Sequence, residues 1–121
     1  MNQSEKEAFR QAIYDIVRTI PPGRATSYGA IAKAIGYPNF SRLVGRIMAE
    51  CDSQENDIPA HRVVNSSGFL SGKEAFGSSD EMQQSLASEG ITVGNNRIQN
   101  WKKVFWNPLD EINILEVAFT K

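Results

Sequence analysis

The stretch that decides the fold spans residues 27–48 and reads SYGAIAKAIGYPNFSRLVGRIM. Ser27 can cap a helix over residues 28–35, because its hydroxyl accepts a hydrogen bond from a free amide of the first turn, and Gly36 is a typical helix terminator. After a four-residue turn, Ser41 is the expected N-cap of a second helix. The apolar positions of that helix are Leu43, Val44, Ile47 and Met48. The stretch therefore predicts a helix-turn-helix, which is two short helices joined by a tight turn.

Basic residues concentrate on this stretch, although the chain of 121 residues has a net charge of −1. The charged residues between positions 24 and 48 are Arg24, Lys33, Arg42 and Arg46. Four acidic residues follow within 50–58, and acids are absent again from 61–73 and 90–103. Because Arg42 and Arg46 lie opposite the apolar stripe of the second helix, this distribution indicates a basic face suited to DNA. The alternatives are an ordinary solvated surface and a helical hairpin that binds nothing.

Helices are expected on both sides of this motif. The apolar residues that recur at helical spacing before it are Phe9, Ile13, Ile16, Val17 and Ile20. Ser4 and Glu7 form a capping-box pattern at the start of this first helix, and the Pro-Pro-Gly sequence at 21–23 ends it. A further helix is expected over residues 80–89. Its two inward-facing residues and its terminating glycine are Met82, Leu86 and Gly90.

Short strands are expected between the motif and the last helix. Residues 61–64 have the pattern of a strand, 65–68 of a turn and 69–70 of a second short run, which together predict a small β-hairpin. The polar or glycine-rich segments 52–57 and 72–79 are predicted to be loops. Residues 91–106 mix β-branched, aromatic, Asn and Gly residues, so strand and loop both stay open there. Aromatic and basic residues are interspersed near the end of this segment, at Trp101, Lys102, Lys103 and Trp106. They could extend a DNA-binding surface, but we favour packing of the aromatic residues against the rest of the domain.

The composition is that of one globular domain, with 40% hydrophobic and 22% charged residues. One Cys and one His exclude an internal disulfide and a Cys/His zinc site, so we expect no metal and no other cofactor. The apolar runs are far shorter than the roughly 20 residues of a membrane span, and residues 1–10 lack the apolar run of a secretory signal. We expect a protein of the cytoplasm, or of the nucleus in a eukaryote, with no membrane contact.

Four segments carry a resemblance to a known family. They are ATSYGAIA at 25–32, SRLVG at 41–45, IPAHRVV at 58–64 and SEGI at 88–91. In this order they resemble the C-terminal domain of the O6-alkylguanine-DNA alkyltransferases. The resemblance implies a mainly α fold, a small helix-turn-helix (winged-helix-like) DNA-binding domain with a short β-hairpin. We therefore expect one domain over residues 1–121, with a core over about 5–93 and a C-terminal extension over 94–121.

One residue departs from the enzymes of that family at the position that carries their chemistry. Where those enzymes have the cysteine that accepts the alkyl group, this chain has Ala60, which has no nucleophilic atom. The chain therefore resembles the alkyltransferase-like proteins, which lack this cysteine. His61 and Glu89 match the pair that activates the cysteine, and here we expect them to hold the pocket strand. Cys51 is a poor substitute, because its acidic neighbours disfavour a thiolate.

The resemblance also implies roles in DNA binding. Tyr28 matches the residue that holds the phosphate of the flipped nucleotide, at a helix start where free amides favour a phosphate. Arg42 matches the residue that enters the stack from the minor groove in place of the flipped base. Without the resemblance, Tyr28 reads as a core tyrosine and Arg42 as a surface arginine. The other residues expected to bind DNA or line the lesion pocket are Ser41, Gly45, Pro59, Ala60, Val63 and Lys73.

These implications define an expected function. We expect a non-enzymatic monomer that binds O6-alkylguanine in double-stranded DNA through the minor groove and flips the damaged base into a pocket without alkyl transfer. It would direct the lesion to nucleotide excision repair, whose proteins are the expected further partners. Two alternatives stay open: an active alkyltransferase that uses Cys51, and a helix-turn-helix transcription regulator that reads the major groove.

Overall fold

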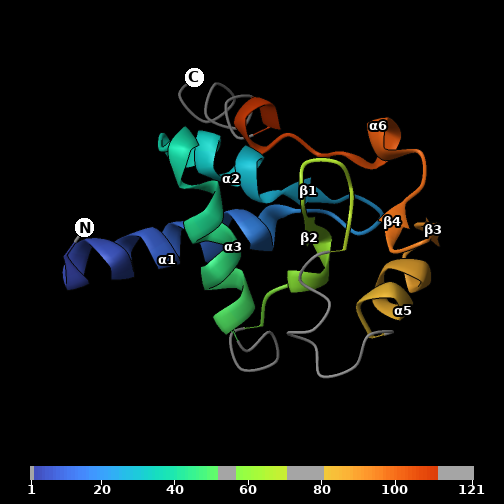
Figure 1. The fold of residues 1–121 in the computed structure, drawn as a ribbon, viewed down its shortest axis with the longest axis horizontal. Helices are drawn as coiled ribbons and strands as arrows, with labels where there is room; N and C mark the ends of the chain where they lie inside the picture. Colours follow the sequence, from blue (N-terminus) through green and yellow to red (C-terminus); the bar gives the residue numbers. More distant parts are fainter. Residues whose placement is uncertain (1, 52–56, 71–80, 112–121) are drawn as a thin grey trace, which may run out of the picture.

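A computed structural model describes residues 2–51, 57–70 and 81–111 of the chain (Figure 1). The fold is mainly helical with one small β-hairpin, as the sequence predicts. The N-terminal end of α1 (Gln3–Thr19) lies at one end of the long axis, and α5 (Glu81–Ser88), α6 (Trp101–Val104) and the hairpin lie at the other. Within the described ranges, no helix has the length and apolar character needed to cross a bilayer.

The predicted helix-turn-helix is formed by α2 (Tyr28–Ile35) and α3 (Ser41–Glu50), joined by the short 3-10 helix η1 (Pro38–Phe40). The predicted cap and stop of α2 are confirmed. Ser27 Oγ accepts a hydrogen bond from the amide of Ala30 at 3.1 Å, and Gly36 has a φ of 99°, which favours glycine. The predicted cap of α3 is wrong. Because η1 runs directly into α3, Ser41 already has helical backbone angles and Phe40 occupies the cap position.

The first helix has the predicted apolar face but begins earlier than predicted. Asn2 is its N-cap, and its side-chain oxygen accepts from the amide of Glu5 at 2.8 Å. Ser4 therefore lies inside the helix and cannot act as the cap. The residues of α1 that are buried are Phe9, Ile13, Tyr14, Ile16 and Val17, and Ile20 is buried at the C-cap.

The predicted position of the hairpin, over residues 61–70, is wrong. Residues 60–62 form a 3-10 helix, η2 (Ala60–Arg62), and β2 (Val63–Val64) pairs in parallel with β1 (Thr26–Ser27). The predicted turn does form, because the amide of Asn65 donates to the carbonyl of Phe69 at 3.1 Å, but Phe69 pairs with Arg97 and not with β2. The hairpin instead joins β3 (Val93–Gly94) to β4 (Arg97–Ile98), inside the segment for which the sequence left strand open. Asn95 and Asn96 have positive φ angles of 53° and 61°, as a tight hairpin turn requires.

Two apolar clusters meet at β2. Val63 belongs to the cluster between α1, α2 and α3, and Val64 to the cluster around α5 and the hairpin, because neighbouring strand residues point to opposite faces. Residues 94–106 contribute to both, since Ile98 is buried in the second cluster and Trp106 in the first. The prediction for α5 is confirmed at its inward-facing residues and its stop: Met82 and Leu86 are buried, and Gly90 has a φ of 85°. The predicted loops lie almost wholly outside the described residues.

Candidate DNA-binding interface

A hollow of about 360 Å³ lies between the helix-turn-helix and the turn that follows β2. It brings together four residues that the sequence predicted as a site: Tyr28, Ser41, Arg42 and Gly45. Three further residues line it that sequence reasoning missed: Gly29, Asn65 and Ser66. Asn65 and Ser66 directly follow the IPAHRVV segment, so their place in the chain was a usable signal. Their contact with the hollow depends on the long-range pairing of β1 with β2.

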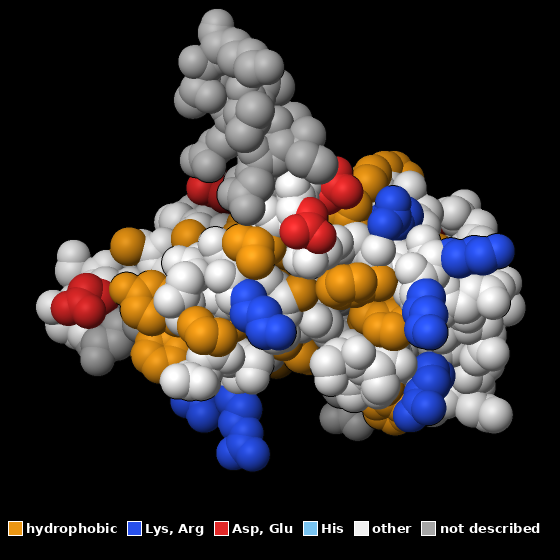
Figure 2. Space-filling model, turned by 90° about the horizontal axis from the view of Figure 1, so that it is seen from above, with side chains coloured by type: hydrophobic (Ala, Val, Ile, Leu, Met, Phe, Trp, Pro, Cys, Tyr) orange, Lys and Arg blue, Asp and Glu red, His pale blue; other side chains and the backbone are white. Residues whose placement is uncertain are grey.

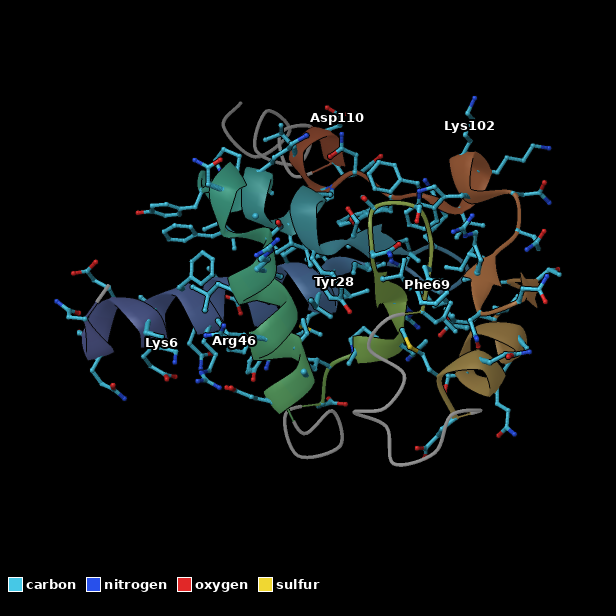
Figure 3. The ribbon with its side chains drawn as sticks, in the orientation of Figure 1. Lys6, Tyr28, Arg46, Phe69, Lys102 and Asp110 are labelled. Atoms are coloured by element: carbon cyan, nitrogen blue, oxygen red, sulfur yellow. The ribbon has the colours of Figure 1, made fainter. Side chains whose placement is uncertain are left out.

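Tyr28 is positioned by the first turn of α2 and by α3. It is the first residue of α2, next to the Ser27 cap, where backbone amides of the first turn have no partner within the helix. Its ring packs against the first apolar cluster and faces Gly45: a Cβ added at Gly45 would lie 3.8 Å from ring atoms of Tyr28. Figure 3 shows Tyr28 in the middle of the molecule, beside α3. The ring is thus held by packing at the edge of the hollow.

Arg42 and Arg46 project from the exposed face of α3. Both side chains are exposed, whereas Val44, Ile47 and Met48 are buried on the opposite face. Among the described residues, no acidic side chain forms an ion pair with Arg42. A guanidinium that lines a hollow without a carboxylate partner is suited to an anionic or aromatic ligand.

The structure does not bring Pro59, Ala60 and Val63 to this hollow. Ala60 and Val63 are buried, 6% and 2% exposed, because η2 and β2 turn them into the first cluster. Pro59 instead lines a separate depression of about 500 Å³, together with Arg18, Asp57, Ile58 and Arg62. Lys73 lies outside the described residues.

His61, Arg62 and Glu89 form one hydrogen-bonded network. His61 Nε2 lies 2.7 Å from Glu89 Oε2, and Arg62 donates from Nε and Nη2 to the same carboxylate at 2.7–3.1 Å. The amide of Gly23 donates to Oε1 at 3.3 Å, and Arg62 Nη1 donates to the carbonyl of Ile20 at 2.8 Å. The network therefore ties the end of α1 to η2 and to the end of α5.

The surroundings of Glu89 keep it ionised. Burial by itself raises the pKa of this carboxyl, but the hydrogen bonds from Arg62, His61 and Gly23 outweigh burial and lower the pKa to about 2. Since an ionised carboxylate can only accept, His61 Nε2 carries the hydrogen of their shared bond. His61 is thus committed to Glu89 through one ring nitrogen.

The described residues offer little for covalent or metal chemistry at this interface. Cys51 is half-buried at the C-cap of α3, packs against the first cluster and does not line the hollow. Within the described ranges, no three His, Cys, Asp or Glu side chains come together as a metal site would require. The side chains around the hollow are suited to binding: a phenol, a guanidinium, hydroxyls, an amide and two glycines.

The chain is similar in sequence to several known proteins. Residues 8–91 match the model of the family described as 6-O-methylguanine DNA methyltransferase, DNA binding domain. The chain is 30% identical to alkyltransferase-like protein 1 of Schizosaccharomyces pombe over 106 residues, which cover 84% of this chain and 97% of that protein. It is 31% identical to the DNA base-flipping protein of Escherichia coli over 105 residues, which cover 85% of this chain and 78% of that protein.

A solved structure has a similar fold. It is the crystal structure of S. pombe Atl1 in complex with damaged DNA containing O6-carboxymethylguanine. The TM-score is 0.74 at 30% identity, and the match covers 88% of this chain and 98% of that chain.

Proposed function

The chain belongs to the family of the 6-O-methylguanine DNA methyltransferase DNA-binding domain, and from this premise we propose that it is a non-enzymatic sensor of DNA damage. It binds O6-alkylguanine in double-stranded DNA from the minor groove and flips the damaged base out of the stack. It transfers no alkyl group and leaves the lesion for nucleotide excision repair. Relatives named for base flipping and a similar structure bound to damaged DNA support this proposal.

The observation that carries the proposal is that Tyr28 and Arg42 line the same hollow. A phenol beside the free amides of a helix start is suited to hold the phosphate of a displaced nucleotide. The Arg42 guanidinium, which has no carboxylate partner among the described residues, can stack between bases and donate hydrogen bonds to the base left without its partner. Ser41 and Gly45 are small, so the backbone of α3 can approach a narrow groove closely.

The chemistry at position 60 supports binding without reaction. Alanine offers no atom that could displace the alkyl group from guanine O6, and His61 is hydrogen-bonded to Glu89. The lesion therefore remains in the DNA after it is bound. Its removal requires proteins that cut the strand around it, which is why we assign the protein to nucleotide excision repair.

Binding and intact-mass measurements test this proposal. The protein is titrated, at a stated salt concentration, against a duplex with one O6-methylguanine and against the undamaged duplex. We expect tighter binding to the damaged duplex and an unchanged protein mass. Arg42→Ala should weaken binding to the damaged duplex by on the order of tenfold or more, because base extrusion costs a few kcal/mol that Arg42 helps to offset. Lys6→Ala, in α1, is the matched basic control.

The possible results separate the alternatives. A mass gain of one methyl group would mean that a residue such as Cys51 reacts, and the protein would be an enzyme. Equal affinity for the two duplexes would overturn lesion sensing. Tight binding to one undamaged sequence would instead indicate a transcription regulator. The fluorescence of 2-aminopurine placed next to the O6-methylguanine reports flipping, because it rises when the neighbouring base leaves the stack.

A further inference from the structure

A second group of basic side chains lies outside the hollow, on the hairpin and α6. Arg97 in β4 and Lys102 and Lys103 in α6 are all exposed. The sequence has no acidic residue from 90 to 106. Figure 2 shows Lys and Arg side chains gathered at this end of the molecule, with the acidic side chains of that view elsewhere. We call Arg97, Lys102 and Lys103 the C-terminal basic cluster.

Trp101 connects the segment that carries this cluster to Ser66 at the hollow. Its indole Nε1 donates to the carbonyl of Ser66 at 3.1 Å, and Ser66 lines the hollow. The indole also packs on Gly68, where an added Cβ would come within 3.1 Å of the ring. The aromatic packing that the sequence favoured for the two tryptophans is confirmed, because Trp106 is buried and Trp101 packs against the second cluster. The two lysines between them stay on the surface.

Backbone hydrogen bonds make the same connection from the hairpin. The amide of Ile98 donates to the carbonyl of Gly68 at 2.9 Å, and the amide of Leu70 donates to the carbonyl of Asn96 at 2.8 Å. Phe69 forms an antiparallel bridge with Arg97, and Figure 3 shows Phe69 between Tyr28 and the hairpin. The turn after β2, the hairpin and α6 therefore form one unit. The C-terminal basic cluster is thereby held on the same unit as Ser66, which lines the hollow.

We propose that Arg97, Lys102 and Lys103 form a second contact with the phosphate backbone of the DNA bound at the hollow. This inference rests on the proposed function, because it takes duplex DNA as the ligand. Ammonium and guanidinium groups bind phosphates irrespective of sequence, and each contact releases counterions from the DNA. A chain with a net charge of −1 can attract DNA only through such local excesses of positive charge. The cluster supplies affinity, and the hollow supplies recognition of the lesion.

The double variant K102A/K103A tests the proposal. Both side chains are exposed and alanine favours helices, so the variant should fold and melt like the wild type. Its affinity should fall about tenfold for the damaged and the undamaged duplex alike, because backbone contacts are indifferent to sequence. The slope of log K against log salt should become shallower by about 2, since each lost phosphate contact removes about 0.9. R97A should act in the same direction.

Lys6→Ala is the matched control. Figure 3 shows Lys6 at the opposite end of the molecule from Lys102, so its removal should leave the affinity and the salt slope unchanged. K102R/K103R should restore the affinity, because it restores the two charges. If K102A/K103A binds both duplexes with wild-type affinity and slope, the second contact does not exist. A loss confined to the damaged duplex would also overturn it, because the cluster would then recognise the lesion.

The same titrations separate this inference from the proposed function. If the wild type does not distinguish the two duplexes but K102A/K103A weakens both, lesion sensing fails and the second contact stands. If the wild type prefers the damaged duplex and K102A/K103A matches it in every measurement, lesion sensing stands and the second contact fails.

Discussion

At position 60 the side chain is a single methyl group, while His61 and Arg62 beside it have polar side chains with structural partners. Both bind the Glu89 carboxylate, which also accepts from the amide of Gly23. The Glu89 side chain is 13% exposed, so little solvent competes for these bonds. Through these bonds the three residues hold the ends of α1 and α5 against η2.

The low pKa of Glu89 makes part of the protein's stability depend on pH. Because folding lowers the pKa of this carboxyl from 4.5 to about 2, its stabilisation is fully present above about pH 4.5 and is lost as the pH falls through about 2. The ionised Glu89 should stabilise the fold by about 2 kcal/mol at pH 7. This is less than the free energy that corresponds to the whole pKa shift, because solvent screens the part of the side chain that stays exposed. Denaturant unfolding of the wild type and Glu89→Gln from pH 2 to 7 measures it.

Glu81→Gln removes an exposed acid at the start of α5 and controls for the loss of one negative charge near this end of the molecule. The stability gap between the wild type and Glu89→Gln should close toward pH 2. A gap that stays constant over the whole range would contradict the role given to the Glu89 network.

Helix ends show where local sequence signals apply and where they fail. Ser27 and Ser41 both precede apolar helical patterns, and the sequence alone predicts a cap at each. Ser27 is the last residue of the strand β1 and has extended backbone angles, so its hydroxyl reaches the amide of Ala30. Ser41 follows a 3-10 helix and is already helical, so it cannot act as a cap. The preceding element decides between the two outcomes.

Two alanine substitutions test this difference. Ser27→Ala should lower the free energy of unfolding by about 1 kcal/mol, because a buried amide of α2 loses its partner. Ser41→Ala should change it by less than about 0.5 kcal/mol, because no capping hydrogen bond is lost and alanine favours helices. Urea unfolding of both variants compares them directly. Equal losses would mean that Ser41 does cap α3.

At the scale of the whole molecule, the contact of Trp101 with Gly68 joins the C-terminal segment to the turn beside the hollow. Gly68 has a φ of 83°, which disfavours any other residue, and Trp101 fills the space that a Cβ would need. The C-terminal segment is also bound to the segment before β1, because the carbonyls of Val104 and Phe105 accept hydrogen bonds from the Arg24 side chain. The two apolar clusters lie on opposite faces of β2, because Val63 belongs to one and Val64 to the other.

Gly68→Ala should therefore lower the stability of the fold. We expect a loss of about 1–3 kcal/mol, because alanine is strained at this φ and its Cβ meets the indole at 3.1 Å. The matched control is Gly29→Ala, which lies in a helix with no atom within 4 Å of the added Cβ and should not lower the melting temperature. Thermal unfolding compares the two variants. A Gly68→Ala protein as stable as the wild type would show that this contact is dispensable.

The sequence by itself determined the four longer helices α1, α2, α3 and α5, because the apolar spacing of residues such as Ile13, Ile31, Val44 and Leu86 depends only on the 3.6-residue period of a helix. It also determined the absence of a nucleophile at position 60 and the family resemblance. Only the tertiary structure decided that β2 pairs with β1, that the hairpin lies at 93–98, and that Asn65 and Ser66 line the hollow while Ala60 and Val63 are buried. These features depend on partners far apart in the chain, and short strands carry too few residues to specify a partner by local pattern.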